Sequence, residues 1–390
     1  MVSAGTLKAA ANTNSMLRVG IIGCGKIADV HASQIQRIEG CEIVAACDRE
    51  ELMARQLSER FRIPRYFSEV AEFLNSSQLD VVHITTPPQS HFELAERCLQ
   101  RGCHVYVEKP FTLHAWEAKE LIELANASAL QLTAGHNAQF THAAIRMRQL
   151  VQQGYLGGPP VHLESLWCYQ LDGDAYGKAA LGSKRHWVRE LPGGLLHNII
   201  SHGIAKLAEF LTSDAQVVSA DGFVSPSLRS QGEKEIIDEL RVMIRDNEHT
   251  TAFFAFSSQM RPSLHQFRIW GPKNGLMMDH DQQTVIKLRG TRYKSYLEMF
   301  VPPLNYAGQY MQNLWRNAGL FLARDFHMES GVKNLLQAFY RSITEKQTVP
   351  IPYREILLTA RIMDDIFRQL HSRRPVTEST AHTIPSLVEH

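Results

Sequence analysis

The first third of the chain alternates short apolar runs with amphipathic segments. The apolar runs predict strands at 18–23, 42–47, 80–85, 104–107 and 131–135. The amphipathic segments predict helices at 28–38, 49–61 and 92–101. Apolar strands that are joined by helices of about ten residues are typical of a parallel sheet covered on both faces. The pattern therefore predicts a doubly wound α/β domain of the Rossmann type over residues 17–135.

The periodicity changes after residue 135, where strand-like runs dominate. A helix is expected at 141–153, and two closing helices are expected at 329–343 and 353–370. The strand-like runs lie at 161–170, 217–224, 240–245, 251–257, 266–271 and 284–288. Many strands with few helices between them predict an α+β domain over 136–370, with a mostly antiparallel open sheet and the last helices packing back on the first domain. Segments 225–235 and 289–318 show no clear period, and no element is predicted there.

Length and charge support this division and exclude several functions. A chain of 390 residues is too long for one ordinary core and suits two. The net charge of +1, without any long run of like charge, gives no reason to expect nucleic acid or an anionic membrane as a partner. No apolar run is long enough to span a membrane, and residues 1–16 lack the apolar core of a secretory signal. We expect a cytoplasmic protein with a disordered leader at 1–16 and a tail at 371–390.

The six cysteines show neither paired nor regular spacing. This pattern argues against a disulfide framework and against a zinc site, so reduced and mostly buried thiols are expected. The histidines likewise show no spacing that suggests a metal site.

A glycine-rich turn carries the clearest chemistry. Gly23, Cys24, Gly25, Lys26, Ile27 and Ala28 follow a predicted strand and open a predicted helix. Such a turn lets the backbone approach a pyrophosphate at a helix N-terminus, and Asp48 at the end of the next strand can bond both hydroxyls of a ribose. A carboxylate disfavours a 2′-phosphate, so NAD is favoured over NADP, although the neighbouring Arg49 could tolerate that phosphate.

Two further segments end strands at the edge where doubly wound folds bind ligands. Thr85, Thr86, Pro87 and His91 follow one strand, and Glu108-Lys109-Pro110 follows the next. Each segment alone could simply end a strand, but the combination of both segments with the glycine-rich turn is a specific indication of a ligand-binding edge.

With these motifs the chain, over roughly residues 17–370, resembles the Gfo/Idh/MocA oxidoreductases, which include glucose-fructose oxidoreductase and inositol dehydrogenase. The resemblance implies that Lys109 lies between nicotinamide and substrate, aimed by Pro110 if that peptide is cis. It also implies a second signature, Gly193-Gly194 followed by Asn198 and His202, in which Asn198 replaces the commoner aspartate. Residues four apart share a helical face, so we expect Asn198 to orient His202.

The resemblance suggests further residues around the reacting atoms. Asn137 is the expected contact to the cofactor amide, and Gln139 stands where an arginine is frequent. Trp187 and Arg189 can stack on and bind a sugar, or can belong to a solvated loop. The residues expected to act in catalysis are Lys109, His202 and Asn198. Those expected to bind the cofactor are Gly23, Gly25, Lys26, Ile27, Ala28, Asp48, Arg49, Thr85, Thr86, Pro87, His91, Glu108, Lys109 and Asn137. Those expected to bind the substrate are Lys109, Gln139, Trp187, Arg189, His197, Asn198 and His202.

The function implied by the resemblance is hydride transfer between NAD and a secondary alcohol or ketone of a sugar, cyclitol or sugar nucleotide. Two alternatives remain open at this point. One is an NAD-dependent glycosidase or lyase that oxidises its substrate transiently, and the other is a non-catalytic NAD-sensing regulator, against which the presence of Lys109 and His202 argues. The resemblance also suggests a homodimer or homotetramer formed through the open face of the second sheet.

Overall fold

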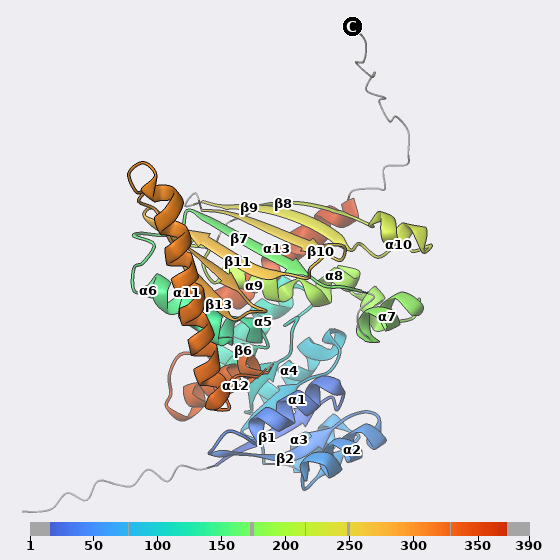
Figure 1. Ribbon diagram of the computed structural model, residues 1–390. Helices are drawn as coiled ribbons and strands as arrows, with labels where there is room; N and C mark the ends of the chain where they lie inside the picture. Colours follow the sequence, from blue (N-terminus) through green and yellow to red (C-terminus); the bar gives the residue numbers. More distant parts are fainter. Residues whose placement is uncertain are drawn as a thin grey trace, which may run out of the picture.

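The first of two domains is built on a parallel sheet, as the apolar runs predicted. The structure is a computed structural model that describes residues 16–76, 78–171, 175–214, 216–247, 250–327 and 329–372, so the expected leader and tail lie almost wholly outside the described residues. Six parallel strands occur in the order β3-β2-β1-β4-β5-β6 (Figure 1). The strands are β1 (Leu17–Ile22), β2 (Cys41–Cys47), β3 (Tyr66–Phe67), β4 (Val81–Ile84), β5 (His104–Val107) and β6 (Leu132–Ala134).

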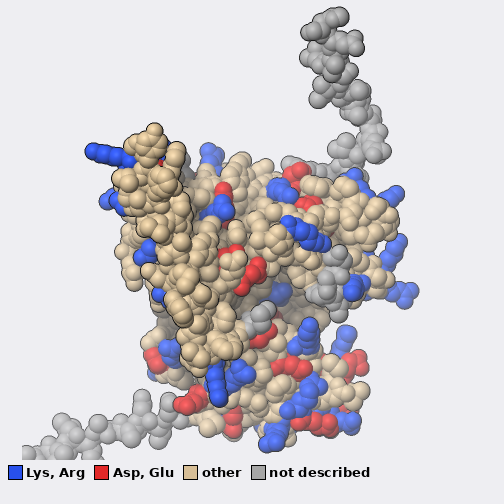
Figure 2. Space-filling model, in the orientation of Figure 1, with Lys and Arg blue, Asp and Glu red and all other residues tan. Residues whose placement is uncertain are grey.

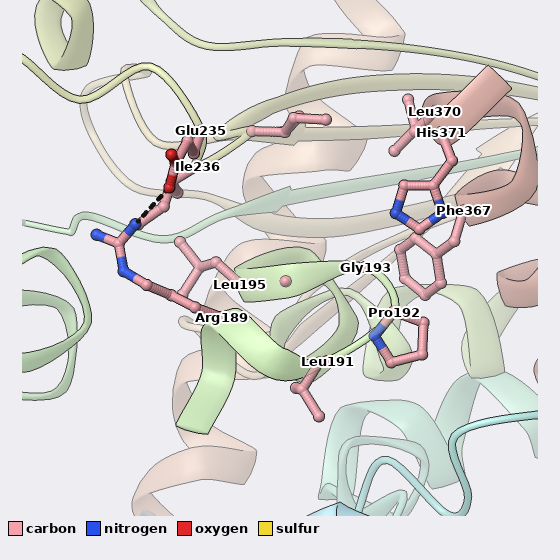
Figure 3. A pocket seen from close by; sticks show the side chains of 12 residues that line it. Arg189, Leu191, Pro192, Gly193, Leu195, Glu235, Ile236, Phe367, Leu370 and His371 are labelled. Atoms are coloured by element: carbon pink, nitrogen blue, oxygen red, sulfur yellow. Dashed lines mark ion pairs between the residues drawn. The ribbon is translucent and has the colours of Figure 1, made fainter. Parts of the chain in front are cut away.

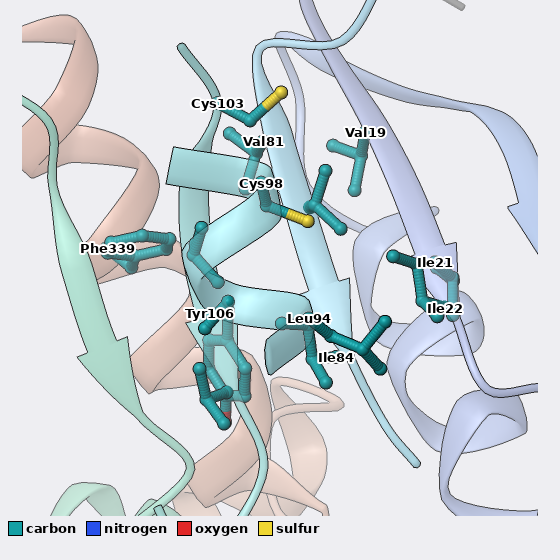
Figure 4. Packing of buried hydrophobic residues seen from close by; sticks show 14 of the residues in the cluster. Val19, Ile21, Ile22, Val81, Ile84, Leu94, Cys98, Cys103, Tyr106 and Phe339 are labelled. Atoms are coloured by element: carbon teal, nitrogen blue, oxygen red, sulfur yellow. The ribbon is translucent and has the colours of Figure 1, made fainter. Parts of the chain in front are cut away.

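Helices connect these strands and cover the sheet. Valine and isoleucine side chains of β1 and β4 are almost fully buried, which is why these strands read as apolar throughout. Figure 4 shows part of this core, in which Leu94 and Cys98 of α4 pack beside Ile84. The helices of this domain are α1 (Lys26–Ile35), α2 (Glu51–Phe61), α3 (Val70–Ser76), α4 (His91–Gln100) and α5 (Ala115–Ala127), with the 3₁₀ turn η1 (Pro88–Ser90).

The second domain is built on a mixed sheet of seven strands in the order β13-β12-β11-β7-β10-β9-β8. Among these neighbours only β7 and β10 run parallel, so the sheet is mostly antiparallel. The two sheets confirm the predicted fold class. The strands are β7 (His162–Cys168), β8 (Gln216–Phe223), β9 (Glu239–Asp246), β10 (Thr251–Ser257), β11 (His265–Trp270), β12 (Asn274–Asp279) and β13 (Thr284–Arg289).

Helices of the second half reach back to the first. Leu335, Leu336 and Phe339 of α12 belong to the core of the first domain, whereas Ile362 and Phe367 of α13 belong to the core of the second. The helices of this half are α6 (His142–Gln152), α7 (Ala175–Gly182), α8 (Gly194–Ile199), α9 (Ser201–Ala208), α10 (Pro226–Ser230), α11 (Leu297–Leu322), α12 (Ser330–Thr344) and α13 (Tyr353–Ser372). The 3₁₀ turns are η2 (Asn137–Phe140) and η3 (Trp187–Glu190).

Two segments without a predicted element contain helices. Short α10 lies within 225–235, and α11 extends over 26 residues of the region that includes 289–318. Helix α11 includes two prolines, Pro302 and Pro303, each of which removes a helical hydrogen bond. None of the described helices combines the length and apolar character needed to cross a membrane.

Candidate active site

The turn between β1 and α1 is shaped for a close backbone approach. Gly23 has a φ of +92°, and a Cβ there would lie 2.7 Å from the backbone nitrogen of Thr86, so a larger residue would be strained and crowded. A Cβ on Gly25, in contrast, would meet no atom within 4 Å, so the space above this glycine is open. Lys26 is exposed at the start of α1, Ile27 is half-buried and Ala28 is buried.

Asp48 is held at the edge of this turn. Its Oδ2 accepts a hydrogen bond from the Cys24 backbone N–H at 2.7 Å, and its Oδ1 accepts one from the Glu50 N–H at 2.9 Å. Each carboxylate oxygen can accept a further bond, so the half-buried carboxylate remains able to bind two ribose hydroxyls. Arg49 beside it is exposed.

The segment after β4 contacts both the glycine-rich turn and the loop after β5. The Thr85 hydroxyl donates to the Gly23 carbonyl at 2.6 Å. The buried ring of His91 lies between the carbonyl oxygens of Thr86 and Pro110, at 2.8 and 2.9 Å from its two nitrogens. His91 therefore holds the two loops together, while Thr86 and Pro87 lie closer to solvent.

Glu108 faces into the first domain rather than toward the open turn. Its Oε1 lies 2.9 Å from His31 Nε2, and its Oε2 accepts the Lys109 backbone N–H at 3.1 Å. Burial is the largest effect and raises the pKa of Glu108, but the hydrogen bonds and charges of His31 and Lys109 together outweigh it, so the pKa is lowered. The side chain predicted to touch the cofactor thus fixes the backbone of its neighbour.

The hydrogen bonds continue from Glu108 to α12. His31 Nδ1 lies 2.8 Å from His83 Nδ1, and His83 Nε2 lies 2.9 Å from the Tyr340 hydroxyl. An ionised Glu108 can only accept, so His31 donates to it, His83 donates to His31 and Tyr340 donates to His83. Burial keeps the pKa of His83 well below and that of Tyr340 well above their ordinary values, which matches these neutral states.

Lys109 reaches across to the second domain. The Lys109–Pro110 peptide is cis. The ammonium donates to the backbone oxygen of Asn198 at 3.1 Å and to its Oδ1 at 3.4 Å. Burial lowers the pKa of Lys109, and the negative charge of Glu108 offsets this only in part. The side chain of Asn198 that faces this lysine is an amide, so it carries no negative charge that would raise the pKa of Lys109.

His202 lies in the predicted region, but its surroundings come from distant strands. Asn198 and His202 fall on successive helices, α8 and α9, which meet at Ile200. The His202 ring lies 5.8 Å from Trp167 on β7, measured between ring centroids, and 6.3 Å from His136. Its buried Nδ1 has no hydrogen-bond partner. Burial is the main reason that the pKa of His202 lies well below its ordinary value, and the charge of Lys109 lowers it further.

Sequence reasoning missed the residues that surround His202. Trp167 also packs against His265 and His280, with centroids 4.5 and 5.7 Å apart. Burial lowers the pKa of His280 to about 3 and that of His136 to about 4. Both ring nitrogens of His136 are buried without a hydrogen-bond partner. Strand alternation could have placed Trp167 and His265 on one face, but their meeting with α9 depends on packing.

Several residues predicted to bind substrate have other contacts. The Gln139 amide donates to Ala205, Glu209 and Glu355, each at 3.3 Å, inside a buried ionic cluster. His197 is buried against Phe367, with ring centroids 4.8 Å apart. Neither side chain faces open space, because both are almost fully buried by these contacts.

Two residues before Gly193, Trp187 and Arg189, make their contacts in different parts of the structure. The Trp187 backbone oxygen accepts a hydrogen bond from Gln89 at 3.1 Å, which joins η3 to the loop after β4. Arg189 instead pairs with Glu233 at 2.7 Å and lines a cavity of about 220 Å³ beside α8 and α13. Figure 3 shows this cavity, which includes the ion pair of Arg189 with Glu235 and is separate from Lys109 and His202.

The residues present fit a dinucleotide. The open space above Gly25 and the held carboxylate of Asp48 suit its pyrophosphate and ribose, and half-buried Asn137 on η2 stays the predicted contact to its amide. Nδ1 of His202 and both ring nitrogens of His136 are buried without a hydrogen-bond partner, so these groups could still bind polar atoms of a ligand. Within the described residues, no three His, Cys, Asp or Glu side chains are arranged to hold a metal ion.

Comparison with known proteins agrees with this geometry. Residues 17–136 match the model of the oxidoreductase family with an NAD-binding Rossmann fold, GFO_IDH_MocA. The chain is 22% identical to myo-inositol 2-dehydrogenase of Thermotoga maritima over 303 residues, which cover 76% of this chain and 86% of that protein. It is 35% identical to UDP-N-acetylglucosamine 3-dehydrogenase of Acidithiobacillus ferrooxidans, over 38% of this chain and 44% of that protein.

A solved structure matches nearly the whole fold. The WlbA dehydrogenase from Bordetella pertussis, in complex with NADH and UDP-GlcNAcA, superposes with a TM-score of 0.73 at 16% identity, covering 92% of this chain and 97% of that one. The matched family model is that of an NAD-binding domain, so NAD is the cofactor of this protein, as the glycine-rich turn and Asp48 predicted. Over residues 17–136, the chain belongs to the Gfo/Idh/MocA family of oxidoreductases with an NAD-binding Rossmann fold.

Proposed function

We propose that this protein is a dehydrogenase that oxidises a secondary alcohol of a sugar, cyclitol or sugar nucleotide, or reduces the corresponding ketone. The observation that carries the proposal is that Lys109, which hydrogen-bonds Asn198, is close enough to the neutral ring of His202 for its charge to lower the pKa of that ring, whose Nδ1 is buried without a partner. The names of the relatives support the substrate class, since they include dehydrogenases of inositol and of a UDP-sugar.

The two side chains divide the proton chemistry. Bound NAD supplies the hydride acceptor, at C4 of its nicotinamide. The lowered pKa of Lys109 brings its neutral amine, which can accept the hydroxyl proton, closer to physiological pH. His202 is neutral because its pKa is well below its ordinary value, so its ring can hydrogen-bond the same hydroxyl without adding charge.

The surroundings of these side chains orient a polar ring. Trp167 offers an aromatic face next to His202, and such faces stack on pyranose rings. His136 and His280 supply further neutral hydrogen-bonding groups. These neutral histidines favour binding of a polyhydroxylated substrate over an apolar alcohol. Asn198 has a positioning role, because both of its oxygens hold the Lys109 ammonium.

The experiment is a screen of cyclitols, sugars and UDP-sugars with NAD, following NADH formation. A hit should be lost in Lys109→Ala while NAD affinity, measured by calorimetry, is retained. Asp48→Ala should weaken NAD binding without unfolding the protein, because the carboxylate is assigned to the ribose. Lys109→Ala with wild-type turnover on an identified substrate would refute the role of Lys109. Release of an aglycone without net NADH would instead favour transient oxidation.

We also infer a homo-oligomer in the cytoplasm, as expected from the sequence. The open face of the second sheet supports self-association, since Val217, Met243 and Phe253 are about half exposed on neighbouring strands.

A further inference from the structure

Helix α11 turns its polar side toward the protein. It runs along the outer edge of the second sheet, beside β13 (Figure 1). The Asn313 amide accepts from the Val285 N–H and donates to the Val285 carbonyl, both at 3.1 Å, and Gln309 makes the same pair of bonds with Lys287 at 2.7 and 3.2 Å. These amides satisfy the free edge of β13. The helix is therefore attached by hydrogen bonds rather than by an apolar face, and Asn313 is its buried residue.

The opposite side of α11 is apolar and exposed. Six of its side chains expose at least 68% of their surface: Met299, Phe300, Leu304, Trp315, Phe321 and Leu322. The charged residues of α11 are Glu298 and Arg316. In Figure 2 the column formed by this helix accordingly carries very few charged side chains. An amphipathic helix normally buries its apolar side, so this arrangement is reversed.

The exposed residues follow the spacing of helices that pair with helices. Apolar side chains recur at alternating steps of three and four along the whole of α11: Leu297, Phe300, Leu304, Ala307, Met311, Leu314, Ala318 and Phe321. Every position of this heptad pattern is apolar over more than three heptads. We call these eight residues the α11 seam. Polar residues at 298, 305, 312 and 316 lie on the other side of the helix.

The area of the exposed face is sufficient for a stable complex. Aromatic side chains bury roughly 150–250 Å² each, so the exposed residues of α11 offer on the order of 1,000 Å². A standard interface buries about 800 Å² on each partner. The small residues Ala307 and Ala318 permit two helices to approach closely at two levels of the seam.

We propose that the α11 seam binds the α11 seam of a second copy of this chain, forming a two-helix contact between subunits. The seam is self-complementary because it is apolar throughout and contains no charge that would repel its own copy. A lipid surface fits less well, since membrane-surface helices are rich in lysine and arginine on their polar side, whereas α11 has a single Arg316 there, offset by Glu298.

The test compares variants of one helix by analytical ultracentrifugation at micromolar concentration. Leu304→Glu combined with Leu314→Glu should raise the dissociation constant of the complex about a hundredfold or more, because it places charges in the seam. Asn305→Glu combined with Gln312→Glu adds the same charge on the other side of α11 and should leave assembly unchanged. Circular dichroism and NAD affinity check that both variants are folded.

Two further measurements complete the test. A chain with Ala307→Cys and Met311→Cys should form a disulfide-linked dimer on oxidation, because these residues lie at the middle of the seam, whereas the wild type should not. The proposal is overturned if the wild type is monomeric or if the seam variant assembles like the wild type. Phe253→Glu on the open sheet face tests the other contact, and the cysteine variant that carries it should still form the disulfide-linked dimer; loss of that dimer would also overturn the proposal. It is also overturned if monomeric wild type binds phosphatidylcholine–phosphatidylglycerol vesicles through the seam.

Discussion

Asn198 is the residue at which this chain departs from the commoner signature of its family, and its contact is with Lys109. The sequence paired Asn198 with His202 through helical spacing. The structure adds that both oxygens of Asn198 accept from the Lys109 ammonium. The identity of this side chain therefore bears on the proton affinity of the lysine.

Asn198→Asp should raise the pKa of Lys109, because a carboxylate favours the ammonium form. The neutral amine would then appear only at higher pH, so the acid limb of kcat/KM for alcohol oxidation should move upward and activity at neutral pH should fall about tenfold. His202→Ala is the comparison, since the pKa of His202 is already so low that its loss should not move this limb. A limb that stays in place in Asn198→Asp would show that Lys109 is not the base.

Gly135 gives a second test at the residue scale. A Cβ at this position would lie 2.8 Å from Glu108 Oε1 and 3.0 Å from the Lys109 backbone nitrogen. Gly135→Ala should therefore displace the loop that carries Lys109 and reduce kcat about a hundredfold, with a smaller effect on NAD affinity. Gly182→Ala, where a Cβ meets no atom within 4 Å, is the matched control. Wild-type kcat in Gly135→Ala would mean that the loop adapts without cost.

At the scale of elements, α12 is tied to the loop after β5 by a line of buried hydrogen bonds. The line runs from Tyr340 through His83 and His31 to Glu108. It joins an element near the C-terminus to the segment that places Lys109.

Tyr340→Phe should lower the free energy of unfolding by about 1–3 kcal/mol, because it leaves His83 Nε2 buried without its donor. Urea denaturation measures the effect. Tyr66→Phe, at a partly exposed tyrosine of β3, should change stability little. Equal stability of the wild type and Tyr340→Phe would show that the hydroxyl makes no net contribution.

At the scale of the whole molecule, a buried ionic cluster joins α6 and α9 of the second domain to α13, far along the chain. Arg148 and Lys206 pair with Glu209 at 2.7 and 2.9 Å, and Glu355 accepts a hydrogen bond from Gln139. Burial, followed by the charge of Glu209, raises the pKa of Glu355 to about 7.

The raised pKa of Glu355 predicts how stability depends on pH. The folded protein holds this proton more tightly than the unfolded chain, so the associated stability is fully present below the ordinary pKa of 4.5 and is lost as pH rises through 7. Glu355→Gln should be more stable than the wild type at pH 8 by about 1–3 kcal/mol and should match it near pH 5. Thermal unfolding between these pH values measures this, with exposed Glu120→Gln as the control. If the difference in stability between Glu355→Gln and the wild type were the same at pH 5 and at pH 8, the raised pKa of Glu355 would be contradicted.

The sequence alone determined the first domain and the nucleotide turn. Strands β1, β2 and β4 were predicted nearly to the residue because their buried positions form short, mostly apolar runs. The roles proposed for Gly23, Gly25 and Asp48 rest on one strand–helix–strand unit, whose local spacing brings the turn and Asp48 together. The alternation of the later strands likewise predicted a mostly antiparallel sheet.

The tertiary structure decided what surrounds Lys109 and what lies outside the core. Lys109 meets Asn198, 89 residues away, and Trp167 meets His202 and His280, because packing and strand register bring these side chains together. No periodicity along the chain carries that information. Helix α11 was equally hidden, because no element was predicted over 289–318 and the exposure of its apolar side depends on how it packs beside β13. The sequence thus specified local geometry, whereas contacts between distant elements depended on the folded chain as a whole.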